Sequence, residues 1–288
     1  MQERELSTVA VIGAGTMGHG IAQVCAAAGC ATRLFDVDAG MIERGLLRVR
    51  ENLDKGVARG KVTQADRDAT LANLRGEAAF SEAVAGVDLV IEAVPEKIAL
   101  KQQIFRDAAG GAAPGAILAT NTSSLSITEI AAAVPDPSRV IGAHFFNPVH
   151  IMKLLELVVG KQTSDATLAA TRAFGARIGK ECITVQDSPG FATSRLGLVI
   201  GLEAIRMVEE GVASAEDIDK AMCLGYGFPM GPLRLTDLVG LDVRLSIAEY
   251  LSEHLQDGAH FRPPALLRAM VAAGNLGKKT GRGFYEWK

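Results

Sequence analysis

Residues 9–18 decide how the chain begins, and they read Val9-Ala10-Val11-Ile12-Gly13-Ala14-Gly15-Thr16-Met17-Gly18. The apolar run predicts a buried strand, and the GxGxxG spacing predicts a tight turn into a helix. Gly13 permits the turn, Gly15 lets a pyrophosphate approach the backbone, and Gly18 lets the helix pack closely on the strand. The N–H groups at the start of this helix favour an anion. We therefore expect residues 13–18 to bind the diphosphate of a dinucleotide.

An acidic residue follows at the distance expected for a ribose contact. The next apolar run, Thr32–Asp36, ends in a carboxylate that can accept hydrogen bonds from the ribose diol and would repel a 2′-phosphate. Arg33 lies inside this run and does not alter that preference. The sequence therefore favours NAD over NADP. The alternatives are a glycine-rich turn without a ligand and a site for another adenosine compound, such as S-adenosylmethionine.

The first two-thirds of the chain alternates short apolar runs with longer amphipathic ones. We expect strands at Thr8–Ile12, Thr32–Asp36, Asp88–Val94, Ala116–Thr120 and Val140–Phe146. We expect helices at Gly18–Ala28, Ala39–Val57, Lys97–Ala109 and Ser126–Val134. Ser126 with Glu129, and Thr63 with Asp66, have the spacing of helix capping boxes. The alternation predicts an α/β fold with a Rossmann-type, doubly wound and mostly parallel sheet, closed by a terminal antiparallel hairpin.

The pattern changes at Asp187-Ser188-Pro189-Gly190. Beyond this point the chain reads as helices, which we expect at Phe191–Glu210, Ala215–Leu224, Pro232–His254 and Pro264–Ala273. We therefore predict an α/β domain over residues 1–187 and an all-helical domain over residues 188–288.

The composition excludes several classes of protein. Of the 288 residues, 48% are hydrophobic, which supplies a core and excludes global disorder, and the net charge of -3 argues against a basic nucleic-acid binder. The cysteines form no CxxC pair, so we expect reduced thiols, no disulfide framework and no metal site. Because no leader segment and no long apolar window appear, we expect a cytoplasmic protein with no membrane or nucleic-acid partner.

A histidine and a glutamate occupy two apolar runs that we expect to pair. His144 lies near the end of Val140–Phe146, and Glu156 is the one carboxylate of Lys153–Val159. A hairpin centred near residue 150 places the two side chains directly opposite, with Cβ atoms about 5 Å apart. The carboxylate would hold the imidazole in one tautomer, as a general base requires. The alternative is a structural pair within the sheet, whereas a serine hydrolase is disfavoured because no GxSxG motif occurs.

Two further groups of residues fit more than one role. Asn121-Thr122-Ser123-Ser124 follows an expected strand and could donate to a substrate oxygen or to a nicotinamide amide, or could simply cap the next helix. The expected helix at residues 39–57 and the turn after it carry basic residues. These form either a solvated face or a docking strip for a phosphate-bearing substrate: Arg44, Arg48, Arg50, Lys55, Arg59 and Lys61.

The motifs together resemble those of one known family. They are His144-Phe145-Phe146-Asn147-Pro148 with Glu156, the run 121–124, Ser188-Pro189-Gly190-Phe191, and the tail at residues 277–285. They are similar to the L-3-hydroxyacyl-CoA dehydrogenase family, and most of all to its bacterial 3-hydroxybutyryl-CoA dehydrogenases. The resemblance implies reversible, NAD-dependent oxidation of the 3-hydroxyl of a short (S)-3-hydroxyacyl-CoA, as in fatty acid β-oxidation. It also implies that the helical domain binds substrate and forms a homodimer.

The resemblance assigns roles residue by residue. His144 would be the catalytic base and Glu156 its orienting partner, while Ser123 and Asn147 would position substrate and nicotinamide. Further contacts implied by the match are Glu96, Lys101 and Lys279 to the cofactor, and Lys55 and Lys61 to CoA.

One residue departs from the family pattern. The family usually reads SPGF-x-x-N-R, with the Asn near the substrate, and this chain has Ser194 at that position. A hydroxyl has a shorter reach than an amide, so we expect Ser194 to act directly or through a bridging water. Two other functions stay open at this point. One is a dehydrogenase of a free hydroxy acid or sugar acid, and the other is a catalytically silent NAD-binding structural protein.

Overall fold

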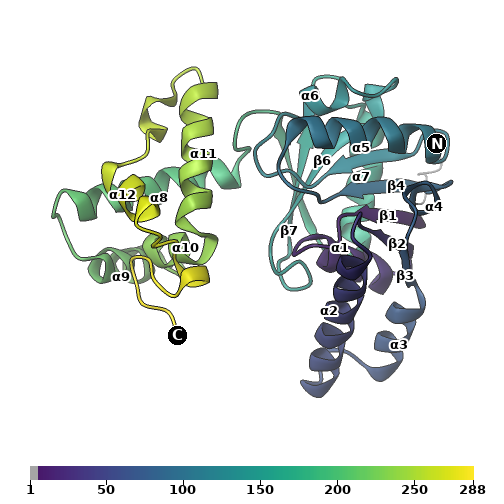
Figure 1. Ribbon diagram of the computed structural model, residues 1–288, viewed down its shortest axis with the longest axis horizontal. Helices are drawn as coiled ribbons and strands as arrows, with labels where there is room; N and C mark the ends of the chain where they lie inside the picture. Colours follow the sequence, from purple (N-terminus) through teal and green to yellow (C-terminus); the bar gives the residue numbers. More distant parts are fainter. Residues whose placement is uncertain (1–5) are drawn as a thin grey trace. The chain divides into compact units, whose positions relative to one another are not determined.

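The computed structural model describes residues 6–288, which divide into two compact units (Figure 1). One unit extends to Asp187, and the other begins at Ser188. Each unit is described by itself.

The first unit is built on a single sheet of parallel strands with one antiparallel pair. Its strand order is β3-β2-β1-β4-β5-β6-β7-β8, and only β6 and β7 pair in the antiparallel sense. The order reverses between β1 and β4, and ligands of doubly wound sheets bind at such a reversal, outside the carboxyl ends of the strands. The strands are β1 (Thr8–Ile12), β2 (Ala31–Phe35), β3 (Leu74–Glu77), β4 (Leu89–Glu92), β5 (Ile117–Thr120), β6 (Val140–Phe145), β7 (Leu154–Val159) and β8 (Glu181–Gln186).

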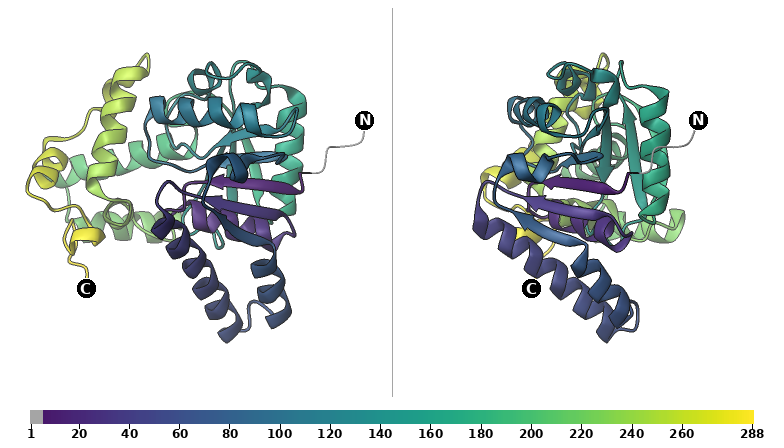
Figure 2. Two further views of the ribbon diagram at one scale, coloured as in Figure 1. Left: turned by 45° about the vertical axis from the view of Figure 1, so that its right-hand side comes forward. Right: turned by 90° about the vertical axis from the view of Figure 1, so that its right-hand side faces the viewer.

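Helices cover both faces of this sheet, which is why its central strands are apolar throughout. Helix α1 packs on β1 and β2, α5 packs on β4 and β5, and α7 packs on the strands from β6 to β8. Helices α2 and α3 contact each other and project together from the sheet (Figure 2). The helices are α1 (Gly18–Ala27), α2 (Ala39–Ala58), α3 (Gln64–Ala72), α4 (Phe80–Val84), α5 (Ile98–Gly111), α6 (Ile127–Ala131) and α7 (Asp165–Arg177), with a 3-10 turn η1 (Pro137–Arg139).

At both predicted capping boxes the N-cap hydrogen bond is present at the start of the helix. The Ser126 hydroxyl accepts a hydrogen bond from the Glu129 N–H at 3.2 Å, ahead of α6. The Thr63 hydroxyl accepts one from the Asp66 N–H at 3.0 Å, ahead of α3. Each bond satisfies a backbone donor that the helix itself leaves without a partner.

The second unit is helical and has its own apolar core. Leu202, Leu233 and Leu241 are among the side chains buried there. No helix within residues 6–288 has the length and apolar character needed to cross a membrane. The elements are α8 (Thr193–Glu209), α9 (Ala215–Tyr226), α10 (Pro232–Val239), α11 (Leu241–His254) and α12 (Ala265–Ala272), with 3-10 turns η2 (Gly258–Phe261) and η3 (Lys278–Thr280).

The single helix expected at Pro232–His254 is wrong. The chain breaks there into α10 and α11 at Gly240, whose φ is 105°. Glycine adopts this conformation without the steric cost that a Cβ imposes. Because the apolar pattern continues on both sides of the break, periodicity alone does not reveal it.

A buried carboxylate on α10 holds the C-terminal tail. Asp237 is 1% exposed, and its carboxylate accepts hydrogen bonds from Phe284 N at 2.8 Å, Tyr285 N at 2.9 Å and Trp287 Nε1 at 2.8 Å. A Cβ on Gly283 would lie 2.1 Å from an Asp237 oxygen, so only glycine fits beside this carboxylate. The tail is therefore an integral part of the helical unit.

Candidate active site

The three glycines of the loop between β1 and α1 differ in the space beside their Cα atoms. Two of them are packed against backbone atoms, and the third faces open space. A Cβ on Gly13, whose φ is 102°, would lie 2.7 Å from the Ala93 carbonyl oxygen, and a Cβ on Gly18 would overlap the Gly13 carbonyl. A Cβ on Gly15 would meet nothing within 4 Å. The loop thus packs tightly against its own sheet and leaves space over Gly15, as the approach of a diphosphate requires.

Asp36, which directly follows β2, is hydrogen-bonded to this loop. Its Oδ2 accepts a hydrogen bond from Ala14 N at 2.8 Å, which places the carboxylate beside the glycines. The neighbouring Arg33 donates through its NH1 to the carbonyl oxygens of Glu82 and Ala85, each at 2.8 Å. Because Arg33 is held at the end of α4, no argument for a 2′-phosphate follows from it, and the residues present fit NAD.

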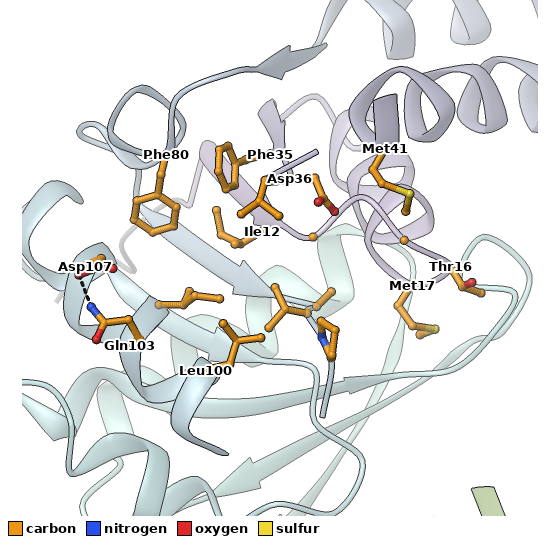
Figure 3. A pocket seen from close by; sticks show the side chains of 17 residues that line it. Ile12, Thr16, Met17, Phe35, Asp36, Met41, Phe80, Leu100, Gln103 and Asp107 are labelled. Carbon is orange, nitrogen blue, oxygen red and sulfur yellow. Dashed lines mark hydrogen bonds between the residues drawn. The ribbon is translucent and has the colours of Figure 1, made fainter. Parts of the chain in front are cut away.

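A cavity of about 790 Å³ extends from the glycine loop (Figure 3). Its walls are mostly apolar and include Ile12, Phe35, Phe80 and Leu100, while Asp36 lies at the side nearest the loop. The Phe35 and Phe80 rings meet edge to face with centroids 5.4 Å apart. An apolar slot ending at a carboxylate is suited to a flat aromatic base followed by a ribose.

His144 and Glu156 face each other across the β6–β7 hairpin. They are direct partners in the antiparallel register, as the sequence analysis predicted, and His144 Nδ1 lies 2.7 Å from Glu156 Oε2. His144 is 7% exposed and Glu156 is fully buried, and the Phe146 ring lies against the imidazole with centroids 4.4 Å apart. Because an ionised carboxylate can only accept, Nδ1 carries the proton and Nε2 is the basic nitrogen of the neutral ring.

A buried ion pair lies at the carboxyl end of β4. Lys101 is 1% exposed, and its ammonium lies 2.8 Å from Glu92 Oε1 and 3.2 Å from Glu96 Oε2. Glu92 also accepts a bond from the Thr120 hydroxyl at 2.7 Å, on the neighbouring strand β5. Sequence analysis singled out Lys101 and Glu96 but missed Glu92, although an isolated carboxylate at the end of an apolar strand was the available signal.

Glu96, which pairs with Lys101, also holds the loop that follows β5. Glu96 Oε1 accepts bonds from the Thr122 hydroxyl at 2.5 Å and from Ser123 N at 2.9 Å. Burial alone would raise the pKa of Glu96, but Lys101 and these donors hold that pKa below its ordinary value. Asn121 Oδ1 accepts from Phe145 N at 2.8 Å and so ties the loop to the end of β6. The loop therefore lies next to the strand end that carries the histidine.

Asn147 lies in the turn between β6 and β7, where the Asn147–Pro148 peptide bond is cis. Lys180, which sequence analysis missed, holds this turn because its buried ammonium donates to the carbonyl oxygens of Val149 and of Met152, the latter at 2.7 Å. No sequence signal distinguished this lysine from a surface one.

The remaining predicted residues belong to α2 and the turn after it, or to the helical unit. Lys55 and Lys61 are exposed at the end of α2 and just after it. Lys279 belongs to the helical unit, where its ammonium lies 2.6 Å from Asp242 Oδ2. Ser194 lies in the first turn of α8. Within residues 6–288, no group of three or more histidine, cysteine or acidic side chains is arranged to hold a metal ion.

Residues 8–188 match the model of the 3-hydroxyacyl-CoA dehydrogenase NAD binding domain, and residues 190–287 match that of the 3-hydroxyacyl-CoA dehydrogenase C-terminal domain. The chain belongs to the 3-hydroxyacyl-CoA dehydrogenase family. Membership confirms the Rossmann-type fold with a helical C-terminal domain, and it identifies the protein as an NAD-dependent oxidoreductase.

Three relatives within the 3-hydroxyacyl-CoA dehydrogenase family are similar to this chain over nearly their whole length. A probable 3-hydroxybutyryl-CoA dehydrogenase of Bacillus subtilis is 45% identical over 99% of this chain and 98% of its own. A 3-hydroxybutyryl-CoA dehydrogenase of Mycobacterium tuberculosis is 44% identical over 98% of this chain and 99% of its own. The crystal structure of (S)-3-hydroxybutyryl-CoA dehydrogenase from Ralstonia eutropha has a TM-score of 0.95 at 43% identity and covers 99% of this chain and 100% of that chain.

Proposed function

We propose that the chain oxidises the 3-hydroxyl of short (S)-3-hydroxyacyl-CoA substrates, such as 3-hydroxybutyryl-CoA, to the 3-oxoacyl-CoA, and catalyses the reverse reduction. The observation that carries the proposal is the His144–Glu156 pair, which lies at the carboxyl edge of the same sheet that holds the glycine loop. The names of the similar proteins support the substrate class.

In this mechanism His144 is the general base. With Nδ1–H donated to Glu156, Nε2 takes the proton of the 3-hydroxyl as the carbon–oxygen double bond forms. The glycine loop and Asp36 would hold NAD, which would supply the hydride acceptor for C3. Glu156 stabilises the imidazolium that results, and in the reverse direction His144 Nε2–H acts as the acid. A base placed in this way typically contributes about 10²–10⁴-fold in rate.

Other residues position the reactants. Ser123 and Asn147 would hold the substrate oxygen and the nicotinamide, Ser194 would contact the substrate directly or through a water, and Lys55 and Lys61 would contact CoA. We assign to the cofactor Gly13, Ala14, Gly15, Thr16, Met17, Gly18, Asp36, Glu96, Lys101, Ser123, Asn147 and Lys279.

We further propose that the protein is a cytoplasmic homodimer joined through its helical unit and serves fatty acid β-oxidation. Leu196, Leu224 and Tyr226 are exposed by 63%, 86% and 79%, although they are large apolar side chains. An exposed apolar patch to which such side chains contribute would favour association. Sedimentation as a monomer at micromolar concentration would contradict the dimer.

The deciding experiment measures NADH formation from (S)-3-hydroxybutyryl-CoA, beside free 3-hydroxybutyrate and a longer 3-hydroxyacyl-CoA. We expect turnover of the CoA thioesters only. Turnover of the free acid would favour the hydroxy-acid alternative. A dinucleotide that binds while no thioester is oxidised would identify a catalytically silent protein.

A further inference from the structure

One wall of the cavity beside the glycine loop is a single side of α5. Four residues of this helix line the cavity at spacings that bring them onto one face: Leu100, Gln103, Ile104 and Asp107. With a rise of about 1.5 Å per residue, the row extends for about 10 Å along the helix axis. It ends in the carboxylate of Asp107, which has no part in the proposed mechanism.

Neighbouring side chains orient this carboxylate. Gln103 Nε2 donates to Asp107 Oδ1 at 2.9 Å, and Gln103 Oε1 accepts from Arg106 NH2 at 2.8 Å, so the amide is bonded at both ends. No hydrogen bond to Asp107 Oδ2 occurs in the part of the chain that the structure describes. Figure 3 shows the bonded pair across the cavity from Thr16 and Met17 of the glycine loop. One acceptor oxygen is therefore available at the end of the cavity remote from that loop.

The middle of the cavity is suited to a flat ring. Val37 is 94% exposed and Leu100 is 38% exposed, although both are apolar and line the cavity. The edge-to-face pair of Phe35 and Phe80 belongs to the same lining. A planar base between these side chains would remove apolar surface from water, which favours binding without selecting one base over another. Selection among bases requires a polar group at the edge of the ring.

We propose that Asp107 recognises the adenine of NAD by accepting a hydrogen bond from its 6-amino group, and so selects adenine over a 6-oxo purine. A dinucleotide with its diphosphate over the glycine loop and its ribose at Asp36 extends its base into the apolar slot, toward Asp107. The amino group of adenine is a donor, as a carboxylate oxygen requires. The 6-oxygen of hypoxanthine is an acceptor, and it would face Asp107 with no proton between the two oxygens. The inference concerns the cofactor and does not depend on the thioester substrate.

The test compares NADH with its deaminated analogue, in which hypoxanthine replaces adenine. Both carry the same nicotinamide, so titration of its fluorescence gives the dissociation constant of each without turnover. We expect the wild-type protein to bind NADH about ten-fold more tightly. Asp107→Asn should bring the ratio close to one, because an amide can accept from the amino group or donate to the oxo group. The matched control is Asp68→Asn, the same change at an exposed carboxylate of α3 outside the cavity, which should keep the wild-type ratio.

A second variant separates recognition of the base from a general effect on the cavity. Asp107→Ala removes both oxygens and should lose the preference mainly through weaker binding of NADH. Because Asp107 is exposed, neither substitution disturbs the core. Equal binding of the two dinucleotides by the wild type would overturn the proposal, and so would a wild-type ratio in Asp107→Asn. If both dinucleotides bind more weakly by the same factor, Asp107 supports the cavity and does not read the base.

The same preparations keep this inference separate from the proposed function. Oxidation of (S)-3-hydroxybutyryl-CoA is measured beside the titrations. Its absence would contradict the proposed function, while the ratio of the two dissociation constants would still decide the role of Asp107.

Discussion

His144 Nδ1 lies 2.7 Å from Glu156 Oε2, and the two residues are direct partners in an antiparallel pair of strands. The two side chains therefore share one face of the sheet, since opposed residues of neighbouring strands always do. The carboxylate of Glu156 can only accept a hydrogen bond, so the proton of the neutral imidazole lies on Nδ1. Both side chains belong to the β6–β7 hairpin. The consequences for rate can be measured separately for each partner.

Glu156→Gln should lower kcat by about 10²–10⁴-fold. The amide fits the same space, but it lacks the negative charge that stabilises the imidazolium and can present a donor to Nδ1, which selects the wrong tautomer. Steady-state turnover of 3-hydroxybutyryl-CoA measures the effect. Glu181→Gln, at the exposed start of β8, is the matched control and should leave kcat unchanged. A Glu156→Gln enzyme with wild-type kcat would remove the carboxylate from the mechanism.

His144→Gln should retain the dinucleotide while losing most turnover. The glutamine side chain cannot take the hydroxyl proton, whereas the glycine loop and Asp36 do not depend on the imidazole. Titration of NADH fluorescence gives the dissociation constant, and NADH formation gives kcat. Loss of binding together with turnover would indicate a structural role for the histidine.

Asp36→Asn should raise the KM for NAD by about ten- to hundred-fold, because a hydrogen bond to a charged group is worth about 1.5–3 kcal/mol. The kcat at saturating NAD should change little. Asp38→Asn is the control, since Asp38 caps α2 through Gly40 N and asparagine caps a helix equally well. Equal effects of the two substitutions would contradict a ribose contact for Asp36.

Glu96 should make the stability of the protein depend on pH in the acid range. Its folded-state pKa is held below the ordinary value, so its ionised form stabilises the folded chain at neutral pH, and this contribution is lost as the pH falls through the lowered pKa. The difference in free energy of unfolding between the wild type and Glu96→Gln should be largest near pH 7 and shrink below about pH 4. Urea unfolding over a pH series measures it. A difference that does not vary with pH would show that the carboxylate gains nothing from Lys101.

The sequence predicts those parts of the fold whose signal is local. The glycine loop follows from spacing, and the His144–Glu156 pairing follows from two apolar strands joined by a short turn. The edge strands β3 (Leu74–Glu77) and β8 (Glu181–Gln186) were not predicted. β3 has four residues, two of them charged, and so resembles a loop, whereas the apolar and β-branched run in β8 was a strand signal that the prediction missed. Pairing with a neighbouring strand, which is a tertiary effect, makes them strands.

The site residues that the sequence did not reveal act through distant partners. Glu92 is recognisable only once Lys101 and Thr120 are placed around it, and these lie on a helix and on another strand. Asp187 was read as a mere boundary, yet its carboxylate accepts bonds from the Ser126 hydroxyl and Thr128 N, both at 2.8 Å, and so fixes the start of α6. A sequence pattern gives the position of such carboxylates but not the donors that make them useful.

The Asp237 carboxylate sets an order of events during biosynthesis. All of its tail donors lie at residues 284–287, so helix α10 keeps an uncompensated carboxylate until those residues have left the ribosome. The α/β unit can finish folding while translation continues, whereas the helical unit must wait for the tail. A chain that ends before residue 284 should therefore fold its α/β unit, about two-thirds of the full length, and leave the helical unit incompletely folded.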